Sequence, residues 1–363
     1  AAPVLLEAGE VATRASGRND GQVLLGLGEH YNRIVGQFGP ERARVLWDYI
    51  AANHERIERE AADFAAACGF ERSGGLRLAE TEHEFAELVE SAELLDAEGI
   101  DHELLDAEAT QRRLPASRGY FGSLFLPGEC VVQPAALVRG LATRARTAGA
   151  RIHERAEVVK VAADASEHVV TLRDGHVIRC AIVVHCTSTL ARDLDASGFL
   201  AEQVFPFRGQ IIATDALPAA TLRDFGPYAM SSNFCYEYFR VHDGRFVIGG
   251  MRWSVPGEQQ NLTDDSTHDD RITQNLRRYV ADHFPVLDGV PFPWVWTGIM
   301  AGTGDGLPLC GELPGQPGVF ALLGFNGYGL SFACEAGVSL SEQILEGRAS
   351  HQAATMLLPR RFR

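Results

Sequence analysis

The start of the chain carries an acid placed where nucleotide-binding folds need one. Residues 3–6 (PVLL) form an apolar run that leads into Glu7 and Ala8, which is typical of a buried parallel strand at its carboxyl end. In a Rossmann unit an acid at the end of the second strand accepts hydrogen bonds from a ribose diol. Glu7 fits this role, although an acid after an apolar run is also common at a solvated strand end.

A second segment suited to chemistry follows directly. Residues 15–21 (ASGRNDG) combine small residues, two glycines and Arg18, so that backbone N–H groups and one guanidinium can approach a diphosphate. A surface turn would have the same composition. We favour phosphate binding because the segment lies shortly after Glu7.

A glycine-rich turn near the end of the chain offers an anion site. Residues 324–329 (GFNGYG) precede a predicted helix, whose unpaired N–H groups and positive dipole end favour a negative charge. The alternative is a turn whose glycines let the helix pack close to a sheet. Residues 296–308 form a tight loop without a nucleophile and base in it.

The glycine fingerprint that normally accompanies such an acid is absent. Counting back from Glu7 places it before residue 1, and residues 26–28 (GLG) lack the third glycine. We therefore expect the chain to open inside a nucleotide-binding fold, whose first strand and glycine loop, roughly 30 residues, are supplied by an upstream segment.

The elements that must position these residues follow from apolar spacing. Helices are predicted over 46–68, over 133–149, over 264–284 with Asp264 or Asp265 as the cap, and from the 324–329 turn to Gly347. Strands are predicted at 150–153, 157–161, 169–173, 178–184, 204–213, 234–241, 246–250 and 319–323, with 178–184 as a buried run. Residues 204–250 read as an antiparallel sheet inserted into an α/β architecture.

Composition excludes several classes of protein. The 363 residues include 33 basic and 48 acidic side chains, and the formal net charge of −15 opposes binding to nucleic acid. No apolar run approaches the roughly 18 residues of a membrane span, and the start resembles no signal peptide, so a cytoplasmic protein without membrane contact is expected. The seven cysteines show no metal-binding spacing, so we expect reduced thiols and no metal site. His30 and His54 are interpreted as structural.

Taken in order, these segments resemble a known family, the FAD-dependent amine and amino-acid oxidoreductases that include D-amino-acid oxidase, glycine oxidase, sarcosine oxidase and γ-glutamylputrescine oxidase. The resemblance covers nearly the whole chain. It rests on Glu7 with residues 15–19, on Val158, on residues 238–250 (YFRVHDGRFVIGG), on Trp296 and Gly298, on Thr303, Asp305 and Pro308, and on residues 324–329.

The resemblance implies roles for individual residues. Glu7 and Ala8 would bind the adenosine ribose, and Val158 the adenine through its main chain. The other implied FAD contacts are Ser16, Gly17, Arg18, Asn19, Cys186, Thr187, Asp305, Gly324, Asn326, Gly327, Tyr328, Gly329 and Leu330. It also implies a Rossmann-like FAD-binding domain (1–30, 131–200 and 299–363) interleaved with a substrate domain (31–130 and 201–298) built on the antiparallel sheet.

Two departures from sarcosine oxidase narrow the expected substrate and cofactor linkage. That relative has a lysine at the position of Ser331 and a carboxylate-binding arginine at the position of Leu25, so a small N-methyl amino acid is disfavoured. Its flavin-attaching cysteine aligns near Gly298, so non-covalent FAD is expected.

The resemblance therefore implies oxidation of the C–N bond of a small-molecule amine or amino acid to an imine, by hydride transfer to FAD and reoxidation by dioxygen. Tyr238, Trp296 and Tyr328 would surround the reacting amine. Two alternatives stay open: a 2-hydroxy-acid or polyol dehydrogenase on the same scaffold, anchored by Arg240 or Arg252, and a non-catalytic flavin-fold protein. The sequence leaves the exact substrate, the electron acceptor and the oligomeric state open.

Overall fold

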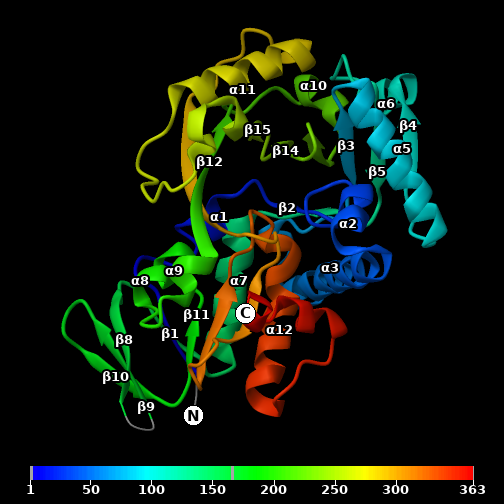
Figure 1. Cartoon of the computed structure of the whole chain (residues 1–363). Coiled ribbons are helices and arrows are strands. Elements are labelled where there is room, and N and C mark those ends of the chain that lie inside the picture. The colour runs from blue at the N-terminus through cyan, green and yellow to red at the C-terminus, as the bar shows by residue number, and fades with distance from the viewer. Residues whose placement is uncertain (1–2, 165–166, 363) are drawn as a thin grey trace.

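The computed structural model describes residues 3–164 and 167–362. Its largest element is an eight-stranded sheet in the order β16-β12-β15-β14-β13-β3-β5-β4, in the upper half of Figure 1. The strands are β3 (Gly75–Ala79), β4 (Glu103–Asp106), β5 (Gly122–Leu126), β12 (Val204–Ala213), β13 (Ala229–Ser232), β14 (Glu237–His242), β15 (Arg245–Gly249) and β16 (Trp294–Thr303). All neighbours are antiparallel except β13 and β3. The expected antiparallel sheet is confirmed, and it also takes in residues 75–126, where no strand was predicted.

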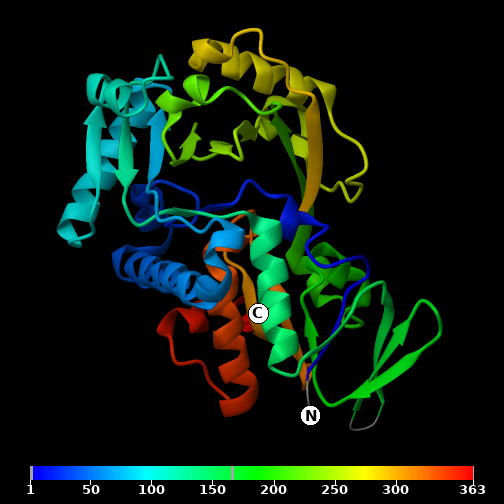
Figure 2. The ribbon, with the colours of Figure 1, turned by 180° about the vertical axis from the view of Figure 1, so that it is seen from behind.

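The two faces of this sheet are covered differently. Helix α11 (Asp270–His283), with α6 (Ala107–Arg113) and α10 (Ala219–Leu222), closes an aromatic core on the outer face, where Phe239, Phe246 and Phe284 pack together. Helix α5 (Glu82–Ala97) packs against β3, β4 and β5 and contacts α2 (Tyr31–Phe38). The face opposite α11, called the inner face below, is directed toward the rest of the molecule (Figure 2).

The lower half of the molecule is an α/β assembly. Strands β11 (Val183–His185), β18 (Val319–Leu323) and β17 (Leu309–Glu312) form one sheet, with β11 and β18 parallel. Helix α12 (Gly329–Glu346) lies along α3 (Pro40–Ala61), and α7 (Pro134–Thr147) packs nearby. The remaining short elements are α1 (Ala15–Arg18), β2 (Gln22–Val23), α4 (Ala65–Cys68), β6 (Cys130–Val131), α8 (Ala191–Leu194) and α9 (Phe199–Gln203). The predicted mixed α/β class is confirmed.

Two predicted buried strands are more exposed than expected. Strand β1 (Val4–Leu6) pairs in parallel with β7 (Arg151–His153), but Val4 and Leu5 are exposed because, within the described residues, only one of its edges is paired. The run 178–184 is split between β10 (Val177–Cys180) and β11, and Ile182 and Val184 are exposed. β10 instead completes a three-stranded meander with β8 (Val158–Asp164) and β9 (Glu167–Leu172).

The helix ends agree with the predictions at α7 and α12. The helix predicted over 46–68 instead begins at Pro40 and ends at Ala61, and a short 3-10 turn separates it from α4, which ends at Cys68 as predicted. Helix α11 begins after Asp269, whose carboxylate accepts the Arg271 N–H, so neither Asp264 nor Asp265 is the cap. The reason is that Asp265 is engaged elsewhere, in a contact described below. No helix in the described ranges has the length and apolar content needed to cross a bilayer.

Candidate active site

A row of residues crosses the inner face of the large sheet. In the strand register Trp296 of β16 lies opposite Ile211, Ile211 opposite Gly249, and Gly249 opposite Tyr238. Residues directly opposite each other in a sheet project to the same face. The register therefore brings the predicted aromatic residues Tyr238 and Trp296 onto one surface, and both pack against the same small apolar cluster.

Glycines on this surface allow close contacts. A Cβ on Gly249 would lie 2.3 Å from the Tyr238 ring, and one on Gly209 would lie 2.7 Å from the Met300 methyl group. The Met300 sulfur in turn lies 3.6 Å from where a Cβ on Gly327 would be. The inner face of the sheet and the turn before α12 therefore meet at Met300.

Tyr328 closes the opposite side of this junction. Its ring packs so tightly on Gly28 that a Cβ there would lie 1.7 Å from it, and its hydroxyl donates to the Gly28 carbonyl at 3.3 Å. Burial, with smaller contributions from Cys235 and Glu29, raises the pKa of Tyr328 well above its usual range. A phenol in this setting stays protonated.

The predicted turn is braced against β16. Asn326 adopts a left-handed conformation (φ 53°), donates its N–H to the Ala301 carbonyl, and accepts the Thr303 N–H on its side-chain oxygen. The first N–H groups of a helix have no intrahelical acceptor, so those of Gly329 and Leu330 are available at the positive end of α12. Asp305, predicted to contact the cofactor, pairs with Arg361 at 2.6 Å.

The Ser16–Asn19 segment is a single helical turn tied to the large sheet. Gly17 approaches the Ala12 carbonyl so closely that a Cβ would lie 2.0 Å from its oxygen. The Arg18 carbonyl accepts the Trp296 indole N–H at 2.7 Å, and the Arg18 guanidinium contacts Asp265 at 2.9 Å. Arg18 is therefore already paired with a carboxylate. The sequence did not predict Asp265 as a residue of the candidate site.

Glu7 lies at the carboxyl end of β1 as predicted. Its Oε1 accepts the Gly9 N–H at 2.8 Å, and its backbone is bonded to His153 and Ala156. The second bond fixes the chain two residues before Val158, the first residue of β8. Glu7, the adjoining turn at Ala8 and the Val158 main chain are thus held in one small region.

Several buried polar atoms have no partner among the described residues. Thr187 Oγ1 lies two residues after the end of β11, Asp20 Oδ2 lies in the loop directly after Asn19, and Gln22 Oε1 lies at the start of β2. Unpaired buried polar atoms are costly and rare, so each indicates a missing hydrogen-bond partner. Their positions, beside the Ser16–Asn19 turn and the end of β11, fit a polar ligand that spans both segments.

Sequence reasoning missed the buried Arg77–Glu129 pair and Asp20 around this site, and it named Arg240 only as a possible anchor for the alternative function. Arg77 and Glu129 form an ion pair at 2.6 Å with both side chains at most 3% exposed. Arg240 donates to the carbonyls of Gly21 and Val132. Asp20 could have been predicted as a site residue because it directly follows the candidate segment that ends at Asn19. No local pattern predicts the Arg77–Glu129 pair, because its members are 52 residues apart.

The histidines are structural, as interpreted. Both His54 ring nitrogens face carbonyl oxygens, of Ile50 at 2.7 Å and Val23 at 2.8 Å, so the side chain fixes β2. His30 is buried near Glu84 and Arg77, and burial lowers its pKa to about 3. No group of three or more metal-ligating side chains occurs within the described ranges.

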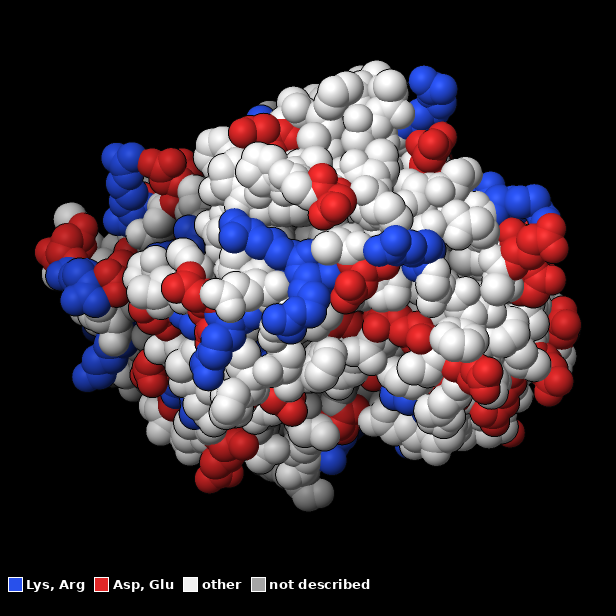
Figure 3. All heavy atoms as spheres, turned by 90° about the horizontal axis from the view of Figure 1, so that it is seen from above, with Lys and Arg blue, Asp and Glu red and all other residues white. Residues whose placement is uncertain are grey.

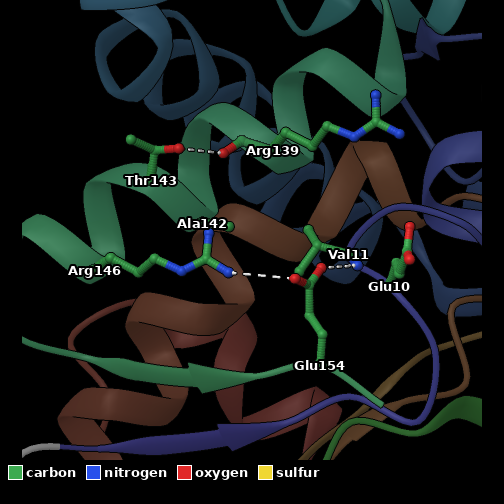
Figure 4. A pocket seen from close by; sticks show the side chains of 7 residues that line it. All are labelled: Glu10, Val11, Arg139, Ala142, Thr143, Arg146 and Glu154. Atoms are coloured by element: carbon green, nitrogen blue, oxygen red, sulfur yellow. Dashed lines mark hydrogen bonds and ion pairs between the residues drawn. The ribbon is translucent and has the colours of Figure 1, made fainter.

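Two hollows border the candidate site. The first, about 380 Å³, lies over the Arg18–Asp265 contact and is lined by Thr267, His268 and Trp296 among others. The second, about 300 Å³, lies between α7 and the loop after β1 (Figure 4). There Glu154 accepts the Val11 N–H at 2.7 Å and lies 3.8 Å from Arg146. Neither hollow contains a nucleophile paired with a base.

An α/β assembly with an acid at a strand end, a tight glycine turn and a helix N-terminus, joined to a large antiparallel sheet, is the arrangement expected of a dinucleotide-binding oxidoreductase. The chain belongs to the DAO family, described as FAD dependent oxidoreductase, whose model matches residues 2–343.

Similar proteins agree with this assignment. The chain is 27% identical to the gamma-glutamylputrescine oxidoreductase of Escherichia coli (strain K12), over 98% of this chain and 80% of that protein. It is 27% identical to the glycine oxidase of Geobacillus kaustophilus (strain HTA426), over 88% of this chain and 80% of that protein. The crystal structure of glycine oxidase from Geobacillus kaustophilus superimposes with a TM-score of 0.80 at 20% identity, covering 98% and 91% of the two chains. That of L-proline dehydrogenase from P. horikoshii gives 0.81 at 18%, covering 100% and 97%. The two structures show the shared fold.

The predicted family, the FAD cofactor and the predicted class of enzyme, an FAD-dependent oxidoreductase of amines and amino acids, are confirmed. The Thr187 hydroxyl and the free amides of α12 are hydrogen-bond donors that fit that cofactor.

Proposed function

We propose that the chain oxidises an amine larger than sarcosine, held by aromatic and polar contacts rather than by a clamp of cations on a carboxylate, with dioxygen as the electron acceptor. The observation that carries the proposal is that the guanidinium groups on the inner face are already engaged by the protein itself.

The terminal guanidinium nitrogens of the cations near the site have partners within the protein, and the buried Nε atoms of Arg77 and Arg240 have none among the described residues. Arg77 pairs with Glu129 and also donates to the carbonyls of Leu25 and Glu29. Arg240 donates to two carbonyls and to His242, and Asp20 lies near enough to oppose the lowering of its pKa by burial.

The remaining candidates for a carboxylate clamp are also occupied. Arg252 donates to the Glu258 carbonyl and stacks over Phe207 at 4.6 Å. The only lysine in the sequence, Lys160, is in the meander strand β8. The position where sarcosine oxidase was expected to place a lysine holds Ser331, whose hydroxyl donates to the Leu24 carbonyl at 2.7 Å.

Acidic side chains favour a cationic substrate instead. Glu82, Glu90, Glu93 and Asp96 are exposed on α5, and Asp and Glu side chains crowd the edge of the molecule at that helix (Figure 3). A surface of one sign attracts ligands of the other sign and raises their association rate. The named substrate of the Escherichia coli relative, gamma-glutamylputrescine, is an amine larger than glycine or sarcosine.

We propose that segments 1–30, 131–200 and 299–363 hold FAD and that 31–130 and 201–298 hold the substrate. Glu7 and Ala8 would accept from the ribose, Val158 would contact the adenine, and Thr187 with Cys186 would line the cofactor. Ser16 to Asn19 would contact the diphosphate and flavin, and Asn326 to Leu330 would face the pyrimidine edge. Asp305 and Gly324 would shape that turn rather than contact the ligand.

When bound, FAD would supply a two-electron acceptor for the hydride of the substrate carbon, and with dioxygen as the final acceptor, amine and O2 would become imine and hydrogen peroxide. The protein must orient the amine and exclude water. The aromatic side chains around the amine would be Tyr238, Trp296 and Tyr328. The protonated Tyr328 hydroxyl, which donates to the Gly28 carbonyl, would hold the Tyr328 ring in position. Binding the neutral amine leaves little need for acid–base help.

Anaerobic substrate screening tests the proposal. The protein would be mixed in turn with polyamines, N-acylated diamines, sarcosine, D-amino acids and 2-hydroxy acids. Each mixture would be followed by the bleaching of the oxidised flavin band at about 450 nm. We expect bleaching by larger amines, and hydrogen peroxide after air is admitted. Bleaching only by sarcosine would refute the size argument, and bleaching only by a hydroxy acid would favour the dehydrogenase reading with Arg240 or Arg252 as anchor. If no compound bleaches the flavin, the result would favour the alternative that the chain is a non-catalytic flavin-fold protein.

A further inference from the structure

The hairpin turn between β13 and β14 has an unusual backbone. Asn233, Phe234 and Cys235 all lie in the left-handed region, with φ of 46°, 56° and 65°. Residues other than glycine are disfavoured there by about 1–2 kcal/mol each. Three in succession persist only where the surroundings hold them, and such strain gathers at functional sites.

Contacts from other elements hold this turn. The Phe234 N–H donates to Oε1 of Glu84, on α5, at 2.6 Å, while Oε2 of the same carboxylate accepts the Glu80 N–H at 2.8 Å. The Arg33 guanidinium lies 3.7 Å over the Phe234 ring. Glu84 is 2% exposed and is the only side chain, within the described ranges, that accepts a backbone N–H of this turn.

The third residue of the turn is also fixed. The Arg77 Nη1 donates to Cys235 Sγ at 3.0 Å, and the Ser231 hydroxyl lies 3.5 Å from the same sulfur. Arg77 lies in the same cross-strand row as Tyr238, because both lie opposite Ser231. The turn is therefore attached directly to the inner face of the sheet.

The turn faces the predicted site rather than open solvent. Arg77 Nη1, which donates to the Cys235 sulfur, also donates to the Glu29 carbonyl at 3.1 Å. Glu29 follows Gly28, on which the Tyr328 ring packs, so one guanidinium joins the turn to the Tyr328 side of the site. The Tyr236 carbonyl lies against Gly250, where a Cβ would be 2.4 Å from its oxygen, so the backbone is clamped on that side as well. The Tyr236 side chain remains 42% exposed.

We propose that residues 233–236 form a rigid wall of the substrate pocket opposite Tyr328, and that Glu84 is the positioning residue that keeps this wall in its strained form and so sets which amine side groups fit. The inference rests on the proposed amine oxidation. Loss of the Glu84 carboxylate would let the turn relax to right-handed backbone angles, which would withdraw Cys235 and Tyr236 from Tyr328.

Glu84→Leu tests the role of the carboxylate, and Glu84→Gln, which keeps one acceptor oxygen for the Phe234 N–H, is the conservative rescue. Glu82→Gln, an exposed acid on the same helix, is the matched control. Cys235→Ala removes the Arg77 contact without touching Glu84, so the wall is still tested if Glu84→Leu fails to fold. For each holoenzyme, anaerobic flavin reduction gives the substrate dissociation constant and the limiting reduction rate for a large and a small amine.

In Glu84→Leu we expect the large amine to bind about tenfold more weakly, with the limiting rate within about twofold and the FAD content unchanged. Cys235→Ala should weaken binding in the same direction, and Glu84→Gln and Glu82→Gln should resemble the wild type. Unchanged binding in both Glu84→Leu and Cys235→Ala, or an equal loss of binding for large and small amines, would overturn the proposal. Amide hydrogen exchange at residues 234–236 needs no substrate and should be faster in Glu84→Leu. If no amine reduces the wild-type flavin, the proposed function fails, and unchanged exchange would independently overturn the positioning role.

Discussion

Replacement of Glu7 should weaken FAD binding without unfolding the protein. Oε1 of its carboxylate accepts the Gly9 N–H at 2.8 Å, which shapes the turn after β1. In the proposed function Oε2 would accept a hydrogen bond from the ribose diol. Glu7→Gln keeps a neutral acceptor for the Gly9 N–H but loses the charge, whereas Glu7→Ala loses both.

The magnitude follows from the bond type. Hydrogen bonds to a charged group contribute roughly 1.5–3 kcal/mol, and each 1.4 kcal/mol is about a factor of ten in affinity. Glu7→Ala should therefore raise the FAD dissociation constant by about 10- to 150-fold, and Glu7→Gln by less. Backbone bonds from Glu7 to His153 and Ala156 remain in both variants, so the melting temperature of the apoprotein should change little.

Titration of apoprotein with FAD, followed by flavin fluorescence, measures the effect. Glu10→Gln is the matched control, because Glu10 is a nearby acid that pairs with Arg155 at the surface. Wild-type affinity in Glu7→Ala would refute the reasoning and reduce Glu7 to a solvated strand end. An equal loss in Glu10→Gln would show that only the general negative charge of the loop matters.

Three further predictions follow from described contacts. Acid precipitation should release FAD to the supernatant, because Gly298 stands where the relative has its flavin-attaching cysteine; flavin that stays in the pellet would contradict this. Asp265→Asn should weaken the Arg14 and Arg18 contacts and lower stability by about 1 kcal/mol, and in a double-mutant cycle its effect should be non-additive with that of Arg18→Ala. Burial raises the pKa values of Glu84 and Glu237 to about 7 each, so the contribution of these two acids to stability is complete below about pH 4.5 and is lost as the pH rises through 7. Thermal unfolding of the wild type and of Glu237→Gln at pH 5 and 8 tests this: relative to the variant, the wild type should lose stability between pH 5 and pH 8, and a pH-independent difference would contradict it.

The sequence predicted well those helices and strands whose signals lie within a few neighbouring residues. The helix over 133–149, the strand Val319–Leu323 and the helix end at Gly347 all follow from residue types within a few positions of each element. The β3–β5 region was missed because its strands are short and lie next to helices whose apolar faces are not distinct in the sequence.

Long-range partners explain the other differences. Arg18 was predicted to face a diphosphate, but its carboxylate partner Asp265 is 247 residues away, and no spacing rule joins them. The same contact explains why Asp265 does not cap α11. Apolar runs predicted strands at 3–6 and 178–184 correctly in type, but burial depends on which strands lie beside them, and this is a property of the assembled sheet.

The pairing of β1 with β7 has a consequence for synthesis of the protein. Val4 lies opposite Arg151, so the first strand cannot find its partner until the ribosome has added the whole intervening chain. At about 5–20 residues per second, β1 waits roughly 7 to 30 seconds for β7, and β11 waits again for β18. Folding from the N-terminus, one domain after another, is therefore not open to this chain. Slower translation would lengthen the time that apolar strands such as Val4–Leu6 remain without a partner, so the yield of folded protein should depend on chaperones that hold them.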